Sequence, residues 1–236
     1  MKSKSIKIIC IYCILFIYLW FQLFENYPYE VSSISILDIL LTESSGYYYF
    51  RNQSTIYSFL FIILLQSRLK KFDIQYIVRV KRKEYVKKVF KINIATAFIF
   101  TFIFMGVSNT LICMFQGVKF LIEVDYFKIL IIAFIVYSMF YMIVGSIYLL
   151  LTILISSKNV AIIGTFIISL ILTLLHIQFK IWTPIKGIMI FDSALYGGID
   201  LISVILTIIK FIIIIGFIYK VALEYFKVKD ILEYEV

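Results

Sequence analysis

Six long stretches of this sequence are almost free of charged residues, and they limit what the chain can fold into. They cover about residues 6–24, 52–67, 92–115, 129–155, 160–179 and 201–219. A helix needs about 20 apolar residues to cross the roughly 30 Å of hydrocarbon in a bilayer. The mean hydropathy of +1.02 and the 63% hydrophobic residues lie outside the range of soluble domains. The sequence therefore predicts an all-α, polytopic membrane protein, with residues 1–236 forming one domain of six transmembrane helices.

The distribution of basic residues predicts the orientation of these helices. With a cytoplasmic N-terminus and six alternating spans, the cytoplasmic segments hold most of the 23 lysines and arginines. The outer segments hold only Arg51, Lys119, Lys128, Lys180 and Lys186. Because cytoplasmic loops carry the excess of positive charge, we predict a multi-pass protein of the cell membrane with both chain ends in the cytoplasm. The net charge of +9 reports this topology, and we expect no nucleic-acid partner.

The first apolar run could be mistaken for a signal peptide. Lys2, Lys4 and Lys7 precede it, as basic residues precede the apolar core of such a peptide. However, no small-residue cleavage pattern follows Phe24. We therefore expect this segment to stay in the protein as a helix.

The densest basic stretch, "RVKRKEYVKKVFK" at residues 79–91, falls in the predicted cytoplasmic connection between the second and third spans. Read as a helix, it has an apolar side and a charged side. The apolar side consists of Tyr85, Val86, Val89 and Phe90, and the charged side of Lys81, Glu84, Lys88 and Lys91. We expect this helix to lie along the membrane interface and to turn into the membrane at Ile92. It could be a topological anchor held by anionic lipids, at about 1 kcal/mol per cation, or a docking element for a partner protein.

The six-span layout and the segment "YIVRVKRKEYVKKVFK" resemble the small permease subunits of ABC exporters of the second type, a group that includes drug, polysaccharide and lantibiotic exporters and immunity transporters. In that family this connection contributes the coupling helix that sits on the ATPase. The stretch between the last two spans forms short helices that dip back from the outer side, and "IWTPIKGIMIFDSALYGGID" at residues 181–200 is similar in length and character. The resemblance implies a cytoplasmic ABC ATPase subunit and a second permease copy or a related permease as partners. It assigns the ATPase interface to Arg79, Lys81, Arg82, Lys83, Tyr85 and Lys88.

The chain itself lacks the residues for ATP hydrolysis. A phosphate-binding P-loop requires a Gly-Lys dipeptide, and this dipeptide does not occur in the sequence. We therefore expect no enzymatic activity and no cofactor in this chain, with ATP hydrolysed by a separate subunit.

Lys210 lies in the middle of the last apolar run, with Ser203 and Thr207 on its side at helical spacing. A charged side chain at this depth is expensive and usually faces protein or water. We expect this polar stripe to turn inward, where it would line a substrate route or bind a partner subunit. A tilted or shifted helix that places Lys210 near the outer headgroups is the alternative.

A second stripe follows the fourth run, and it consists of Ser138, Tyr141, Gly145, Tyr148 and Thr152. Small and hydroxyl-bearing residues let membrane helices approach closely and form hydrogen bonds. Close helix packing is therefore the favoured interpretation, and a transport surface is the alternative.

No residue pattern indicates catalysis or metal binding. Cys10 and Cys13 have redox spacing but lie in an apolar helix without metal-binding companions, and His176 has no second histidine at ligand spacing. We expect a permease subunit that exports an amphipathic or peptide-like cargo, because a Tyr- and Phe-rich route suits such molecules. A non-transporting immunity or accessory protein that binds a toxin or sensor, and an intramembrane lipid-modifying enzyme, are the alternative functions.

Overall fold

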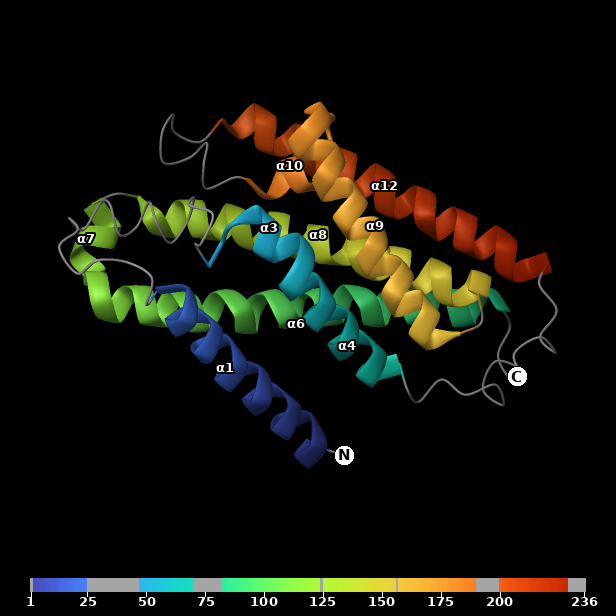
Figure 1. Cartoon of the computed structure of the whole chain (residues 1–236), viewed down its shortest axis with the longest axis horizontal. Coiled ribbons are helices and arrows are strands. Elements are labelled where there is room, and N and C mark those ends of the chain that lie inside the picture. The colour runs from blue at the N-terminus through green and yellow to red at the C-terminus, as the bar shows by residue number, and fades with distance from the viewer. Residues whose placement is uncertain are drawn as a thin grey trace.

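The computed structural model describes residues 2–24, 47–69, 82–123, 125–155, 157–189 and 200–228, and these ranges contain helices and no strand. The helices are α1 (Lys2–Phe24), α3 (Phe50–Asn52), η1 (Gln53–Tyr57), α4 (Ser58–Leu69), α6 (Arg82–Gln116), α7 (Val118–Glu123), α8 (Tyr126–Ile155), α9 (Lys158–Phe179), α10 (Pro184–Ile188) and α12 (Leu201–Val228). α6 and α8 run side by side in opposite directions, and the other long helices lean against this pair (Figure 1).

α8 is the centre of the bundle. It contacts α4, α6, α9, α10 and α12, whereas α1 packs on α6. Within its most apolar window 56% of the residues are buried, against 11% for α12. The sequence of α8 explains this position, because a helix that is apolar all round can be buried from every side.

α9 shows how the sequence separates a packing face from an outer face. Its buried residues are Ala161, Thr165, Ser169 and Thr173, which repeat every four positions. The isoleucines between them, at positions 163, 167 and 171, are exposed. Small residues at the contact let the backbones approach, while the branched apolar side chains are suited to lipid.

Within the described ranges, four helices are long and apolar enough to cross a membrane, namely Lys83–Phe115, Tyr126–Ile155, Lys158–Phe179 and Leu201–Phe226. They correspond to the third to sixth predicted spans. The first predicted span appears as a shorter apolar helix at Lys7–Gln22, within α1. The second is the helical segment of α3, η1 and α4, which one π-helical turn interrupts. The described part of the chain is thus all-helical with four potential membrane helices, and a total of six crossings stays a prediction.

The turn predicted at Ile92 is wrong. α6 runs without interruption from Arg82 to Gln116. The reason lies in the spacing of its buried residues, because Val86, Val89 and Phe90 continue the same bundle-facing stripe as Asn93 and Ala97. No glycine or proline occurs between Arg82 and Ala97 to break the helix.

The connection before the last span contains a short helix, as the resemblance implied. α10 begins with Pro184, a favoured first residue of a helix, and buries Ile185 and Ile188 against the bundle. It contacts α8, α9 and α12. Residues 190–199 lie outside the described residues, and the depth of this segment in the membrane stays a prediction.

Candidate functional site

Five helices meet at the end of the bundle that we call the basic end. It contains the last residues of α4, α8 and α12 and the first residues of α6 and α9, toward the right in Figure 1. The opposite end contains α7. Because residues from α4, α6, α8 and α9 line one pocket there, segments that are distant in the sequence come together at the basic end.

The first turns of α6 have the two predicted sides. Val86, Val89 and Phe90 are buried, with at most 5% of each side chain exposed. The exposed residues of the same turns are Lys83, Glu84, Lys87, Lys88 and Lys91. Of the other residues assigned to the ATPase interface, Arg79 and Lys81 lie outside the described residues, and Arg82 is described only as the start of the helix.

Two aromatic pairs hold the start of α6 against the end of α12. The ring of Tyr85 stacks on Phe226 with centroids 5.3 Å apart, and Phe90 meets Tyr219 edge-on at 4.9 Å. Tyr85 is half-buried through this packing. The geometry gives Tyr85 an anchoring contact within the chain, in addition to the interface role that the resemblance implied.

Cations from other helices surround the same end. Arg68 at the end of α4, Lys158 at the start of α9 and Lys220 in α12 are exposed. The Arg68 guanidinium also donates a hydrogen bond to the Thr96 hydroxyl at 3.3 Å. A surface with so many cations has a positive potential that attracts anionic partners.

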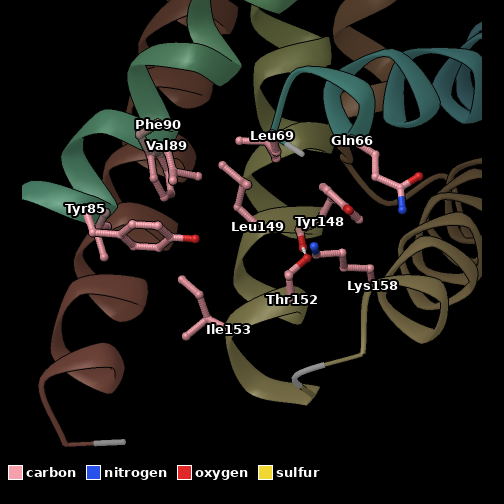
Figure 2. A pocket seen from close by; sticks show the side chains of 11 residues that line it. Gln66, Leu69, Tyr85, Val89, Phe90, Tyr148, Leu149, Thr152, Ile153 and Lys158 are labelled. Atoms are coloured by element: carbon pink, nitrogen blue, oxygen red, sulfur yellow. Dashed lines mark hydrogen bonds between the residues drawn. The ribbon is translucent and has the colours of Figure 1, made fainter. Parts of the chain in front are cut away.

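A pocket of about 50 Å³ opens at the basic end (Figure 2). Apolar side chains form most of its wall, namely Leu69, Val86, Val89, Phe90, Leu149 and Ile153. Its polar lining residues are Gln66, Tyr85, Tyr148, Thr152 and Lys158. The hydroxyl of Tyr85 and the amino group of Lys158 both point into the space between the helices.

The Ser138 to Thr152 stripe of α8 lies inside the bundle. Ser138, Tyr141, Gly145 and Tyr148 are buried, and Thr152 is half-buried. At Gly145 the Asn93 side chain of α6 comes so close that an added Cβ would lie 1.9 Å from its Oδ1 atom. Asn93 donates hydrogen bonds to the Met142 carbonyl at 2.9 Å and to the Ser146 hydroxyl at 3.2 Å. Close packing of α6 on α8 therefore accounts for Gly145, and the role of the stripe as a whole stays a prediction.

Sequence reasoning missed the polar network around the π-helical turn η1. The Tyr141 hydroxyl donates to Gln53 Oε1 at 2.6 Å, and Gln53 Nε2 donates to the Tyr47 carbonyl at 3.2 Å. On the other side, the Ser169 hydroxyl donates to the Ser54 carbonyl at 2.5 Å. These bonds tie η1 to α8 and α9. The signal was a glutamine beside an apolar run, because a buried amide needs partners.

The aromatic residues next to η1 belong to the same network. The Tyr47 hydroxyl donates to the Phe104 carbonyl at 3.3 Å, and the Tyr126 hydroxyl donates to Asn109 Oδ1 at 2.5 Å. Burial raises the pKa of Tyr47 and Tyr48 above the ordinary value for tyrosine. Both hydroxyls therefore stay protonated at neutral pH and act as donors.

Two buried tyrosines of α8 provide a matched test of this network. Tyr141→Phe removes the 2.6 Å bond and leaves Gln53 Oε1 without its donor, so we expect a loss of about 1–3 kcal/mol in the free energy of unfolding. Tyr137→Phe removes a longer bond, of 3.4 Å, to the Tyr48 carbonyl and should cost less. Thermal unfolding of both variants in detergent measures the difference. Equal destabilisation would contradict a structural role for the Gln53 bond.

The predicted inward turn of the Lys210 stripe is wrong within this chain. Ser203 and Lys210 are exposed, and only Thr207 is half-buried. The buried residues of α12 are Phe211, Ile218, Ala222 and Phe226. At about 100° per residue they lie roughly 80° or more around the helix from Lys210. Lys210 instead places its amino group 4.7 Å from the centre of the Trp182 ring. This cation–π contact covers one side of the charge.

The large aromatic side chains fill the core of the chain. Phe16 of α1, Phe100 and Phe104 of α6 and Tyr141 of α8 are fully buried. Their rings pack on one another, with Phe100 and Tyr141 centroids 4.8 Å apart and Phe16 and Phe104 centroids 5.7 Å apart. A Tyr- and Phe-rich route for cargo is therefore absent from the interior of the described bundle.

Cysteine and histidine side chains have no special arrangement in the described ranges. Cys10, Cys13 and Cys113 are free thiols. His176 lies beside Met189, with 3.2 Å between Nε2 and the sulfur. Among the described residues, no three His, Cys, Asp or Glu side chains form a group that could hold a metal ion.

No protein-family model, no curated protein and no solved structure matches this chain.

Proposed function

We propose that this chain is the membrane-spanning permease subunit of an ATP-driven exporter that resembles ABC exporters of the second type. A separate cytoplasmic ATPase would dock on the basic end, and a second copy or a related permease would complete the transporter. The cargo would be amphipathic or peptide-like. The observation that carries the proposal is the form of α6, in which the basic residues from Arg82 onward and the apolar span are one continuous helix.

The length of α6 supports a mechanical role. Its 35 residues extend about 50 Å at 1.5 Å per residue, which exceeds the roughly 30 Å of hydrocarbon. One part of the helix must therefore lie outside the hydrocarbon, and the segment with Lys83, Lys87 and Lys88 is the charged part. A partner that binds this segment would move a continuous helix that crosses the bilayer.

The packing of α6 supports the transfer of such movement to other helices. Tyr85 and Phe90 bind the start of α6 to Phe226 and Tyr219 of α12. Asn93, less than one helical turn after Phe90, packs closely against Gly145 of α8. A shift of the basic end would therefore displace α12 and α8 together, because packed helices respond as discrete units.

The exposed charges support an anionic partner surface. Lys83, Lys87, Lys88 and Lys91 point away from the core, while the apolar residues of the same turns are buried. Complementary charge guides the encounter of two proteins and fixes their register. A cytoplasmic ATPase with an acidic groove would fit this surface.

The packed core supports a second copy. Because aromatic side chains fill the described interior, a cargo route through the bundle has no space, and a route between two chains is the remaining arrangement. α9 and α12 offer wide apolar faces for this, with exposed residues such as Ile163, Ile167, Ile205 and Ile212.

Co-purification tests the proposal. Tagged chain, solubilised in a mild detergent from its native cells, should bring down an ATP-hydrolysing subunit in a fixed ratio. Protection of the cells against a toxin without any captured ATPase would favour an immunity or accessory protein. Lipid turnover by the purified chain alone would favour an intramembrane enzyme. Either result would contradict the permease function.

A further inference from the structure

We propose that the pocket at the basic end binds the headgroup of an anionic phospholipid, with Lys158 contacting the phosphate and the apolar wall contacting the first chain carbons. The inference goes beyond the proposed function and does not require an ATPase partner. It rests on the lining, the charge and the position of the pocket.

The lining has the two kinds of surface that a lipid requires. Leu149 and Ile153 of α8 and Val86 of α6 form part of the apolar wall. Lys158 and Tyr85 supply an ammonium group and a hydroxyl group. Thr152 adds a hydroxyl oxygen, and its proton is donated to the Tyr148 carbonyl at 2.8 Å. In Figure 2 the amino group of Lys158 points toward Thr152 rather than away from the protein. A phosphate between these groups would receive hydrogen bonds from a charged and a neutral donor.

The charge of the pocket favours an anion. Among the described residues that line the pocket, Lys158 is the only lysine, arginine or carboxylic residue. No carboxylate of the described residues forms an ion pair with it. Arg68 and Lys83 on neighbouring helices add positive charge at the same end. A zwitterionic headgroup would bring its own cation into this positive surrounding, so an anionic headgroup is the better fit.

The position of the pocket favours a lipid over a free phosphate compound. The pocket lies where α4 and α8 end and where α6 and α9 begin, beside the apolar faces of these helices. Helix ends with lysines are at headgroup depth when the helices cross a bilayer. The pocket volume of about 50 Å³ holds only a part of a molecule. The rest of the ligand must lie outside it, which suits a lipid whose chains remain in the bilayer.

Native mass spectrometry of the purified full chain tests this inference. The probes are phosphatidylglycerol and phosphatidylcholine with identical chains, each titrated into the delipidated protein in detergent. We expect the chain to bind phosphatidylglycerol more tightly than phosphatidylcholine. Lys158→Gln should lower the affinity for the first bound phosphatidylglycerol by about fivefold, because one cation near a membrane surface contributes about 1 kcal/mol. Lys158→Arg should retain the binding.

Matched variants separate the pocket from the general charge of the protein. Lys180→Gln removes an exposed cation from the opposite end and should leave the binding unchanged. Ile153→Trp fills the pocket and should abolish the preference, whereas Leu154→Trp places the same ring on the exposed neighbouring position and should keep it. Size-exclusion profiles identify any variant that fails to fold, and the comparison of phosphatidylglycerol with phosphatidylcholine on the unchanged chain then carries the test.

Three results would overturn the inference. Equal affinities for the two lipids would exclude recognition of an anionic headgroup. An unchanged preference in Lys158→Gln would place the lipid on other cations. Displacement of phosphatidylglycerol by millimolar inorganic phosphate alone would show that the site takes a free phosphate without a need for lipid.

Discussion

Gly145→Ala is expected to destabilise the chain, although it adds a single methyl group. The added carbon would lie 1.9 Å from Oδ1 and 2.7 Å from Cγ of Asn93. Asn93 cannot simply rotate away, because its amide nitrogen donates hydrogen bonds to the Met142 carbonyl and to the Ser146 hydroxyl. Either α6 separates from α8 or these hydrogen bonds break. We expect a loss of about 1–3 kcal/mol in the free energy of unfolding.

Gly106→Ala is the matched control for this prediction. Gly106 also lies within α6, and an added Cβ there would meet nothing within 4 Å. Alanine is favoured over glycine in a helix, so this variant should be neutral or slightly more stable. Thermal unfolding of the two variants in detergent gives the comparison. If both variants behave alike, the close approach of α6 and α8 at Asn93 is refuted.

The double variant Lys83→Glu/Lys88→Glu is expected to release the ATPase from the purified chain. Both lysines are exposed in the first turns of α6, and reversing them replaces attraction by repulsion. Like charges that face each other at an interface cost several kcal/mol of binding free energy. We therefore expect the affinity for the ATPase to fall by about a hundredfold or more. Pull-down at a series of ATPase concentrations measures it. Lys119→Glu/Lys180→Glu at the opposite end is the control and should leave capture unchanged.

The same double variant distinguishes a coupling surface from a topological anchor. If the cations serve only to fix orientation, reversing them would reduce insertion or invert the topology. If they hold the ATPase, the amount of inserted protein would remain while the partner is lost. Loss of insertion with normal ATPase capture by the remaining protein would contradict the coupling function.

The local structure of the basic stretch could be predicted from its sequence, and its relation to the membrane helix could not. The spacing of Val86, Val89 and Phe90 indicated a buried face, and the structure buries all three. The turn expected at Ile92 rested on the idea that charge marks an interface helix. The same apolar stripe continues through Ala97 and Phe100, and packing on α8 keeps the helix straight.

The surroundings of Lys210 could not be predicted from the local sequence pattern. Periodicity placed Ser203, Thr207 and Lys210 on one side of a helix, but it does not tell which side the neighbours cover. The bulky Phe211 and the small Ala222 decide that, because they pack against the bundle. Trp182, which reaches Lys210 from the connection before α10, is 28 positions away in the sequence. Such a contact depends on the tertiary fold and not on local pattern.

The network at Gln53 was missed for a related reason. Gln53 stands at the edge of an apolar run, where a polar residue usually faces the headgroups. Gln53 is buried as the first residue of the π-helical turn, and no simple sequence rule predicts such a turn. Tyr141, in contrast, was recognised as part of a packing stripe, and the structure supplies Gln53 as its partner.

The permease proposal requires the start of α6 to lie in the cytoplasm, and impermeant thiol labelling of whole cells tests this orientation. In a background with Cys10, Cys13 and Cys113 replaced by serine, Lys83→Cys adds one thiol at the basic end, and Lys119→Cys adds one at the opposite end. We expect the reagent to label the Lys119→Cys protein in intact cells and to label the Lys83→Cys protein only after the cells are opened. Labelling of Lys83→Cys from outside intact cells would place the basic end on the outer surface, where no cytoplasmic ATPase could bind it.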